Sequence, residues 1–192
     1  MGYSKGWILN SVKILCHVDS GSEVTEDIWV DVFRVEASFD FTFPEREDED
    51  GNLYVRNAKV YVLPKDVRDR LTEFDKKVEH SFQLRCPSFV ENALLEHTFI
   101  EGTLSKQEVD EWMEELRVLE NEYFQIRNEI VKQYENLIAR FVSEFLNTYV
   151  PPHHRAETRA GFKKTIPSKV MYRSSFRIKI TPREPKKVGV LQ

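Results

Sequence analysis

The longest uninterrupted helical pattern in this 192-residue chain places the strictest limit on its fold. From Ser105 to Tyr149, apolar side chains recur every three or four residues, and neither Gly nor Pro occurs before Pro151. Ser105 and Glu108 form the signature of a capping box, in which each side chain caps the backbone amide of the other. About 45 residues at about 1.5 Å each span on the order of 65 Å, which exceeds the need of a compact domain of this size.

Such a helix is marginal in water by its own propensity, so packing must stabilise its apolar side. A shorter amphipathic helix predicted over 65–85 covers only part of it, and the remainder must pack on a sheet, on a partner or on a second copy. We expect residues 106–149 to form the contact surface for partner proteins, although aromatic residues at this spacing also suit the chain's own core. The candidate partner-binding residues are Trp112, Leu116, Leu119, Tyr123, Phe124, Ile130, Tyr134 and Phe141.

Alternating patterns predict strands on both sides of the helices. Residues 33–43 place apolar side chains at the odd positions and polar ones at the even positions, which is typical of a sheet with one solvated face. A strand over 53–63 follows the charged turn 45–52, so the two strands form a hairpin with a long loop. Similar alternation predicts strands over 12–18 and 170–180.

These patterns predict an α+β fold: an antiparallel sheet of about four strands, including the long hairpin, with a helical hairpin that contains the long helix. Residues 88–104 are expected to form a packed connection or a short helix. The predicted organisation is a sheet over 1–64 and 170–181, a helical hairpin over 65–150, a basic connection over 151–169 and a disordered basic tail over 182–192.

The net charge of −4 conceals a strong asymmetry. Residues 151–192 contain eleven Lys or Arg against two Asp or Glu. Cations on one face of a strand repeat at a spacing close to that of nucleic-acid phosphates, so this segment could bind nucleic acid or another polyanion. The alternative is pairing with the acidic remainder of the chain, for example with Glu36 and Asp40. The candidate polyanion-binding residues are Arg155, Arg159, Lys163, Lys164, Arg173, Arg177 and Lys179.

The sequence carries no local motif for catalysis or for a cofactor. Its seven glycines are isolated, which argues against a phosphate-binding loop. A calcium loop aligned on Gly51 would need carboxylates where Arg46 and Asn57 stand. His153 and His154 lack a third fixed ligand nearby, so no metal site is predicted. We expect a protein that is not an enzyme and has no cofactor, with a triad assembled in space as the open alternative.

Cysteine usage and hydropathy indicate a cytoplasmic protein. Cys16 and Cys86 are too few for a disulfide framework and are interpreted as small core residues. No apolar run approaches the roughly 18 residues of a membrane span. Residues 1–6 contain no apolar signal core.

The order of several segments resembles that of a known family. An apolar strand with a polar turn, Val12 to Gly21, precedes Lys59-Val60-Tyr61-Val62-Leu63-Pro64, which leads into a helix. A long helix with aromatic residues, Tyr123-Phe124 to Tyr149, then precedes a Pro167-Ser168 turn and a closing strand, Phe176 to Ile180. The segments from about residue 55 to 182 are similar to a phage- and plasmid-borne family of unknown function, encoded near MoxR-type AAA ATPases and von Willebrand A proteins. The resemblance implies an accessory or adaptor role beside an ATPase and no catalytic residues.

The excess helix length predicts a non-enzymatic scaffold or adaptor subunit of a multi-protein assembly, which contacts partners or a second copy through the long helix. The alternative prediction is a nucleic-acid-binding subunit of a viral or defence ribonucleoprotein that uses the basic C-terminal segment.

Overall fold

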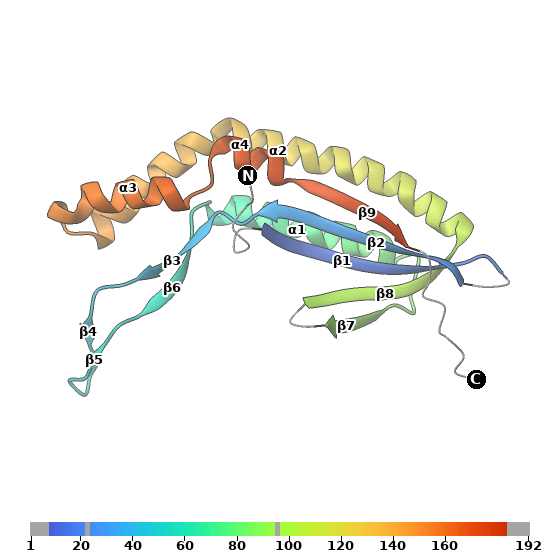
Figure 1. Ribbon diagram of the computed structural model, residues 1–192, viewed down its shortest axis with the longest axis horizontal. Coiled ribbons are helices and arrows are strands. Elements are labelled where there is room, and N and C mark those ends of the chain that lie inside the picture. Colours follow the sequence, from blue (N-terminus) through green and yellow to red (C-terminus); the bar gives the residue numbers. More distant parts are fainter. Residues whose placement is uncertain (1–7, 22–23, 95–96, 184–192) are drawn as a thin grey trace.

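The computed structural model describes residues 8–21, 24–94 and 97–183. It confirms an α+β fold with one large sheet and one very long helix (Figure 1). The strands are β1 (Ile8–Asp19), β2 (Val24–Val35), β3 (Ser38–Thr42), β4 (Arg46–Glu47), β5 (Leu53–Tyr54), β6 (Asn57–Tyr61), β7 (Val90–Leu94), β8 (His97–Ser105) and β9 (Arg177–Arg183). The helices are α1 (Lys65–Gln83), α2 (Lys106–Tyr149), the 3-10 turn η1 (Pro152–His154), α3 (Arg155–Thr165) and α4 (Lys169–Ser175).

The main sheet has five strands in the order β7-β8-β1-β2-β9. β1 pairs with β2 in antiparallel fashion, with Ile14 opposite Val30. It pairs with β8 in parallel, with Ile14 opposite Ile100. The prediction of an antiparallel sheet of about four strands is therefore wrong in detail, because the sheet is mixed and includes β7 and β8. Residues 88–104, expected as a connection or a short helix, supply both of these strands.

A glycine explains why the alternation of apolar and polar residues did not predict β8. Gly102 lies opposite Cys16 on the face of the sheet that α1 and α2 cover. A Cβ at this position would lie 2.4 Å from Cys86 Sγ and 3.2 Å from the ring of Phe82. The close packing of β8 under the end of α1 thus requires a residue without a side chain. An apolar side chain is missing from the middle of the strand, so the alternation is hidden.

The strand predicted over 170–180 is wrong in its first half. Residues Lys169–Ser175 form α4, and β9 begins only at Arg177. The hydroxyl of Ser168 caps this short helix by accepting from the amide of Met171 at 3.2 Å. Tyr172 and Phe176 are one helical turn apart and both are buried. The residues after 183, part of the tail predicted to be disordered, lie outside the described residues.

The strand predicted over 33–43 is divided into β2 and β3, which bend apart between Val35 and Ser38. The predicted apolar face of odd-numbered positions holds only in part in β2. Val35 is buried as predicted, but the half-buried Phe33 lies on the face opposite to the buried Ile28, Val30 and Val32. The predicted hairpin is confirmed, since β3 pairs with β6 in antiparallel fashion.

The long helix is confirmed as one continuous element of 44 residues. Its capping box is formed: the amide of Glu108 donates to Ser105 Oγ at 3.3 Å, and the amide of Ser105 donates to Glu108 Oε2 at 2.8 Å. The helix ends just before Pro151, which cannot continue the helical hydrogen-bond pattern.

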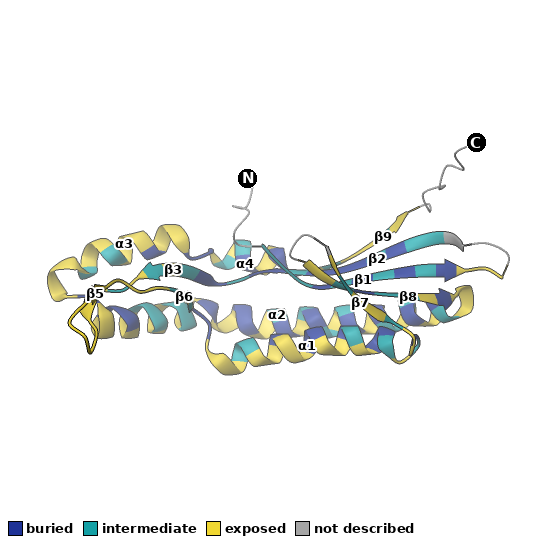
Figure 2. Ribbon diagram, turned by 90° about the horizontal axis from the view of Figure 1, so that it is seen from below, coloured by how far each residue is buried: buried dark blue, intermediate teal, exposed yellow. Residues whose placement is uncertain are grey.

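Both long helices lie on one face of the main sheet, as Figure 2 shows from below. Phe74 of α1 stacks on Tyr123 of α2 with ring centroids 4.7 Å apart. Trp112 Nε1 donates to Ser81 Oγ at 3.0 Å, so a buried polar group is satisfied. The two helices pack side by side as predicted for a helical hairpin. Their connection, however, is the β7–β8 hairpin of the main sheet.

The far end of α2 belongs to a second, smaller packing unit, which we call the arm. It comprises residues 134–150 of α2, η1, α3, residues 166–169 and the ladder from β3 to β6 (Figure 1). Residues 151–169, predicted as an irregular basic connection, are helical over most of their length. The arm is held by aromatic rings, since Phe39 lies 5.8 Å from Phe145 and 4.8 Å from Phe162 between centroids. The rest of the described chain is called the body below.

Candidate functional site: a groove on the arm

The structure places most of the predicted partner-binding residues inside the chain's own core. Phe124 and Phe141 are half-buried: Phe124 lies under the guanidinium of Arg127, and Phe141 packs on Phe39. The apolar side of α2 in the body is covered by the main sheet and by α1, which removes the reason for expecting a partner there. The buried predicted residues are Trp112, Leu116, Leu119, Tyr123, Ile130 and Tyr134.

The predicted polyanion-binding residues fall into separate groups. Arg173 belongs to α4, so it does not share a strand face with Arg177 and Lys179 as predicted. Those two residues lie on β9, where the guanidinium of Arg177 sits 4.9 Å from the ring of Phe33. The predicted row of three strand cations does not form. The four other cations, Arg155, Arg159, Lys163 and Lys164, lie together on α3.

A groove on the arm brings members of both predicted sets together. It has a volume of about 650 Å³ and runs along α2 from Tyr134 to Ser143, with α3 and residues 166–169 as the opposite wall. At about 1.5 Å per residue, the α2 wall is about 14 Å long. Its floor is apolar and includes Ile138, Val142, Phe162, Ile166 and Pro167.

The chain folds into this shape because Tyr134 fixes the loop after α3. Its hydroxyl donates to the carbonyl oxygen of Pro167 at 2.6 Å, and its ring stacks on Tyr172 with centroids 4.6 Å apart. Burial raises the pKa of Tyr134, so the hydroxyl keeps its proton and remains a donor. The buried side chain of Ile166 completes the floor.

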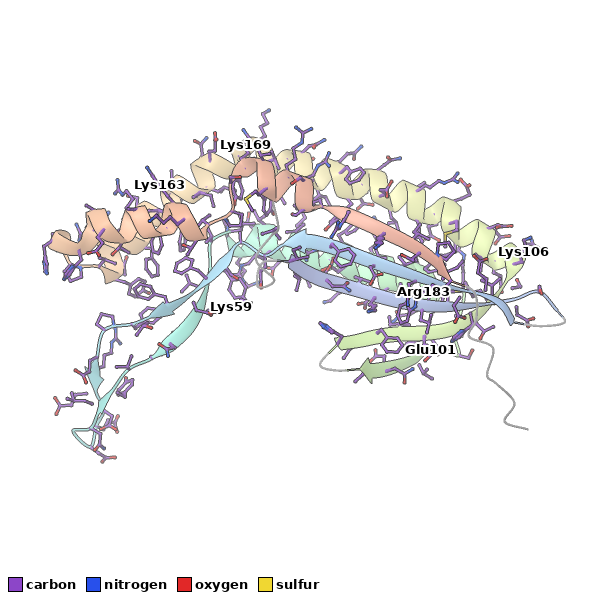
Figure 3. The ribbon with its side chains drawn as sticks, viewed as in Figure 1. Lys59, Glu101, Lys106, Lys163, Lys169 and Arg183 are labelled. Carbon is purple, nitrogen blue, oxygen red and sulfur yellow. The ribbon has the colours of Figure 1, made fainter. Side chains whose placement is uncertain are left out.

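Cations dominate the rim of the groove. Arg159 and Lys163 come from α3, Lys169 opens α4, and the single carboxylate is that of Glu135. Lys169 Nζ lies 3.9 Å from Glu135 Oε2, which makes a loose, exposed ion pair. Within the described ranges, no ion pair is recorded for Arg159 or Lys163. Figure 3 shows Lys163 and Lys169 on the side of the arm away from Lys59 of β6.

The arm also carries an acidic hairpin tip. Residues 45–50 contain five carboxylates and one arginine. Asp48 Oδ1 accepts from the amides of Asn52 at 2.8 Å and Asp50 at 2.9 Å, and these bonds, that from Asn52 foremost, lower the pKa of Asp48. Next to this turn, Leu53 and Val55 are 66% and 54% exposed. The predicted charged turn is thus confirmed, whereas the exposed apolar residues beside it were not recognised as a surface feature.

Among the described residues that line the groove, no pair of titratable side chains converges on its apolar floor. In the described part of the chain, no group of three or more His, Cys, Asp or Glu residues is placed to hold a metal. His153 and His154 lie side by side in η1, with ring centroids 4.1 Å apart, and both are exposed. Cys16 and Cys86 are free and buried, as predicted for core residues.

No family model, no curated protein and no solved structure matches this chain. The resemblance to the family encoded near MoxR-type ATPases therefore stays a prediction. None of the described helices combines the length and the apolar character that crossing a bilayer requires.

Proposed function

We propose that this protein is a non-enzymatic scaffold or adaptor subunit of a multi-protein assembly, acting in the cytoplasm, and that it binds its neighbours through the arm. The observation that carries the proposal is the groove, with an apolar floor of Ile138, Val142 and Phe162 under a cationic rim. Apolar surface rimmed by polar groups is typical of protein-binding sites. The free, buried thiols of Cys16 and Cys86 suit a reducing compartment.

The chain itself presents an occupant of matching chemistry. The hairpin tip combines the carboxylates of residues 45–50 with the exposed apolar side chains of Leu53 and Val55. The groove offers the opposite charge, from Arg159, Lys163 and Lys169, around an apolar floor. We therefore propose that the hairpin tip of one copy docks in the groove of the next. Opposite charges on the two surfaces steer the encounter and set its orientation, and apolar burial supplies affinity.

This contact joins two different surfaces, so it is heterologous. A heterologous contact forms a ring if the rotation between subunits closes and a filament if it does not. Either outcome makes the protein a repeating unit on which other components can be arranged. The long α2 would set the spacing between repeats, because it connects the groove to the body.

Charge reversal tests this proposal. Light scattering after size-exclusion chromatography should show wild-type mass rising with protein concentration. The double variant Arg159→Glu/Lys163→Glu and the double variant Glu47→Lys/Glu49→Lys should each remain monomeric. Combining all four substitutions in one chain should restore association, because the charges are again complementary. Asp48 is left intact since it holds the turn.

A matched control is Lys76→Glu/Lys106→Glu, which reverses two exposed cations of the body and should leave the mass unchanged. A wild-type protein that stays monomeric at every concentration would refute self-assembly. So would association that survives reversal of the groove charges.

Binding of a polyanion is the second candidate, and the α3 cations favour it. Arg159, Lys163 and Lys164 are exposed on one short helix, whereas Arg155 donates to the carbonyl oxygen of Val150 and caps α2. Fluorescence anisotropy with a labelled single-stranded RNA of about 20 nucleotides, a length that spans a typical single-strand site, tests this candidate. Affinity should fall steeply with salt and vanish in Arg159→Glu/Lys163→Glu/Lys164→Glu. RNA binding that the triple variant retains, or no binding at low salt, contradicts it.

A further inference from the structure

A second, smaller cavity lies in the body near its junction with the arm. It has a volume of about 220 Å³ and lies between the end of β2, the start of α1 and α4. Polar side chains from each of these elements reach it, and the residues that carry the argument are Arg34, Glu36, Arg68, Thr72 and Tyr172. It is separate from the groove, so it is independent of the proposed assembly function.

The hydroxyl of Tyr172 is the unusual feature of this cavity. The side chain is fully buried, and its hydroxyl has no hydrogen-bond partner among the described residues. The ring is held by stacking on Tyr134 and by edge contact with Phe176, with centroids 4.6 Å and 5.1 Å apart. Burial raises the pKa of Tyr172, so the hydroxyl keeps its proton, and the charge of Arg34, another lining residue, partly opposes this rise. A buried hydroxyl without a partner is destabilising and calls for a bound group.

The neighbouring arginine also has unused donors. Arg68 Nε donates to the carbonyl oxygen of Leu63 at 3.2 Å, and its guanidinium lies 4.5 Å from the ring centroid of Tyr61. No hydrogen bond is recorded for its terminal nitrogens within the described ranges. The guanidinium plane is therefore fixed at the cavity with donors to spare, which is the usual arrangement for binding an oxyanion.

The carboxylates at and beside the cavity are already paired with other cations. Glu36 Oε2 is bound by Lys59 Nζ at 2.6 Å. The terminal nitrogens of Arg34 donate to both carboxylate oxygens of Asp75, at 2.8 Å and 2.7 Å. Each carboxylate thus neutralises a cation, and the positive charge of Arg68 is left over. The terminal nitrogens of Arg68 can only donate and the hydroxyl of Tyr172 can donate, so a ligand rich in acceptors suits both.

We infer that this cavity binds a small oxyanion, held by the hydroxyl of Tyr172 and the terminal nitrogens of Arg68. Its volume admits an ion the size of phosphate or a short dicarboxylate, and it falls short of the usual range for drug-sized ligands. The ligand would tie α1 to α4 beside the point where β2 bends into β3. Binding therefore stabilises the junction between body and arm.

Thermal unfolding with inorganic phosphate as the probe tests the inference. A ligand that binds the folded state raises the melting temperature as its concentration rises. Phosphate should raise it above the value in sodium chloride of equal ionic strength, and Tyr172→Phe and Arg68→Gln should each weaken phosphate binding by about tenfold, the equivalent of about 1.4 kcal/mol. Tyr172→Phe should fold normally without phosphate, because it removes only the hydroxyl. Arg70→Gln is the control, since Arg70 is on the same helix and is paired with Glu129.

A parallel series with succinate identifies the source of the oxyanion. Stabilisation by phosphate alone assigns a phosphoryl ligand, stabilisation by succinate alone assigns a carboxylate, and either result supports the site if the two variants weaken it. The inference is overturned if neither ion exceeds the effect of chloride. It is also overturned if Tyr172→Phe and Arg68→Gln respond to the ion as fully as the wild type.

Discussion

The body and the arm share one helix but are stabilised in different ways. In the body, the apolar side of α2 is covered by a sheet and a second helix, and buried polar groups are paired: Tyr123 Oη donates to the carbonyl oxygen of Phe33 at 2.8 Å, and Arg34 forms a two-point pair with Asp75. In the arm, the core consists of packed phenyl rings, and apolar surface remains in a groove and at a hairpin tip. The core of the body thus lies between a sheet and two helices, whereas the arm keeps an open apolar groove beside its core.

The largest effect is expected from breaking the buried ion pair of the body. Asp75→Ala leaves the guanidinium of Arg34 buried without its partner, and the free energy of unfolding should fall by about 3 to 5 kcal/mol. Urea denaturation followed by circular dichroism measures the change. Asp69→Ala is the control, because Asp69 forms an exposed pair with Lys65, and the loss there should stay below about 0.5 kcal/mol. Equal losses in the two variants would mean that the buried pair has no special role.

The next largest effect tests whether the arm can be destabilised without the body. Phe145 is buried, with ring centroids 4.8 Å from Phe41 and 5.5 Å from Phe162. Phe145→Ala should destabilise the arm by about 3 kcal/mol, since it leaves a cavity among the rings. Hydrogen exchange should then show faster exchange of backbone amides in α3 and β3, with the amides of β1 and α1 still protected. Equal acceleration in β1 would show that body and arm unfold as one unit.

The smallest effect concerns the face of the main sheet that the long helices do not cover. There, ion pairs of His17 connect β1 to its two neighbouring strands. His17 Nδ1 lies 2.6 Å from Asp27 Oδ1, and Nε2 lies 2.6 Å from Glu101 Oε1. Burial lowers the pKa of His17, but the bonds to Glu101 and Asp27 together outweigh it, so the pKa is raised above 6.5. The stabilisation is therefore complete below the unfolded pKa and is lost as pH rises through the higher folded pKa.

Because these side chains are partly exposed, the change should amount to about 1 kcal/mol or less. Thermal unfolding across this pH window should show the loss in wild type and not in His17→Gln. His80→Gln, at an exposed position of α1, should keep the pH dependence. A wild-type protein whose stability is flat across the window would mean that the three side chains do not interact as the geometry indicates.

Elements whose sequence signals are local could be predicted, and elements that depend on tertiary packing could not. The long helix was predictable because its signals, the cap at Ser105 and the absence of Gly and Pro, are local. β8 was missed because Gly102 fills a core position with no side chain. α4 was missed because Tyr172 and Phe176 fit both a helical and an alternating pattern, and only tertiary packing decides between them.

The groove could not be predicted for a different reason. Its walls come from α2 and from residues 159–169, and no sequence pattern states that these segments face each other. The exposed residues Leu53 and Val55 were interpreted as strand residues, and their exposure depends on the arm carrying no further layer there. The sequence showed that the cations of α3 are close together in the chain, but it did not show that they lie beside α2.

The continuity of α2 has a mechanical consequence. β8 leads directly into it at Ser105, and it reaches the groove without a Gly or Pro at which it could bend. In the body, α2 is held by the main sheet and α1, so only about 15 residues, on the order of 22 Å, project beyond this packing, and a tilt of about 5° there moves the far end by about 2 Å. Any larger displacement of the groove by a bound neighbour must therefore shift the packing of α2 in the body, and through it β8, the strand next to the edge strand β7.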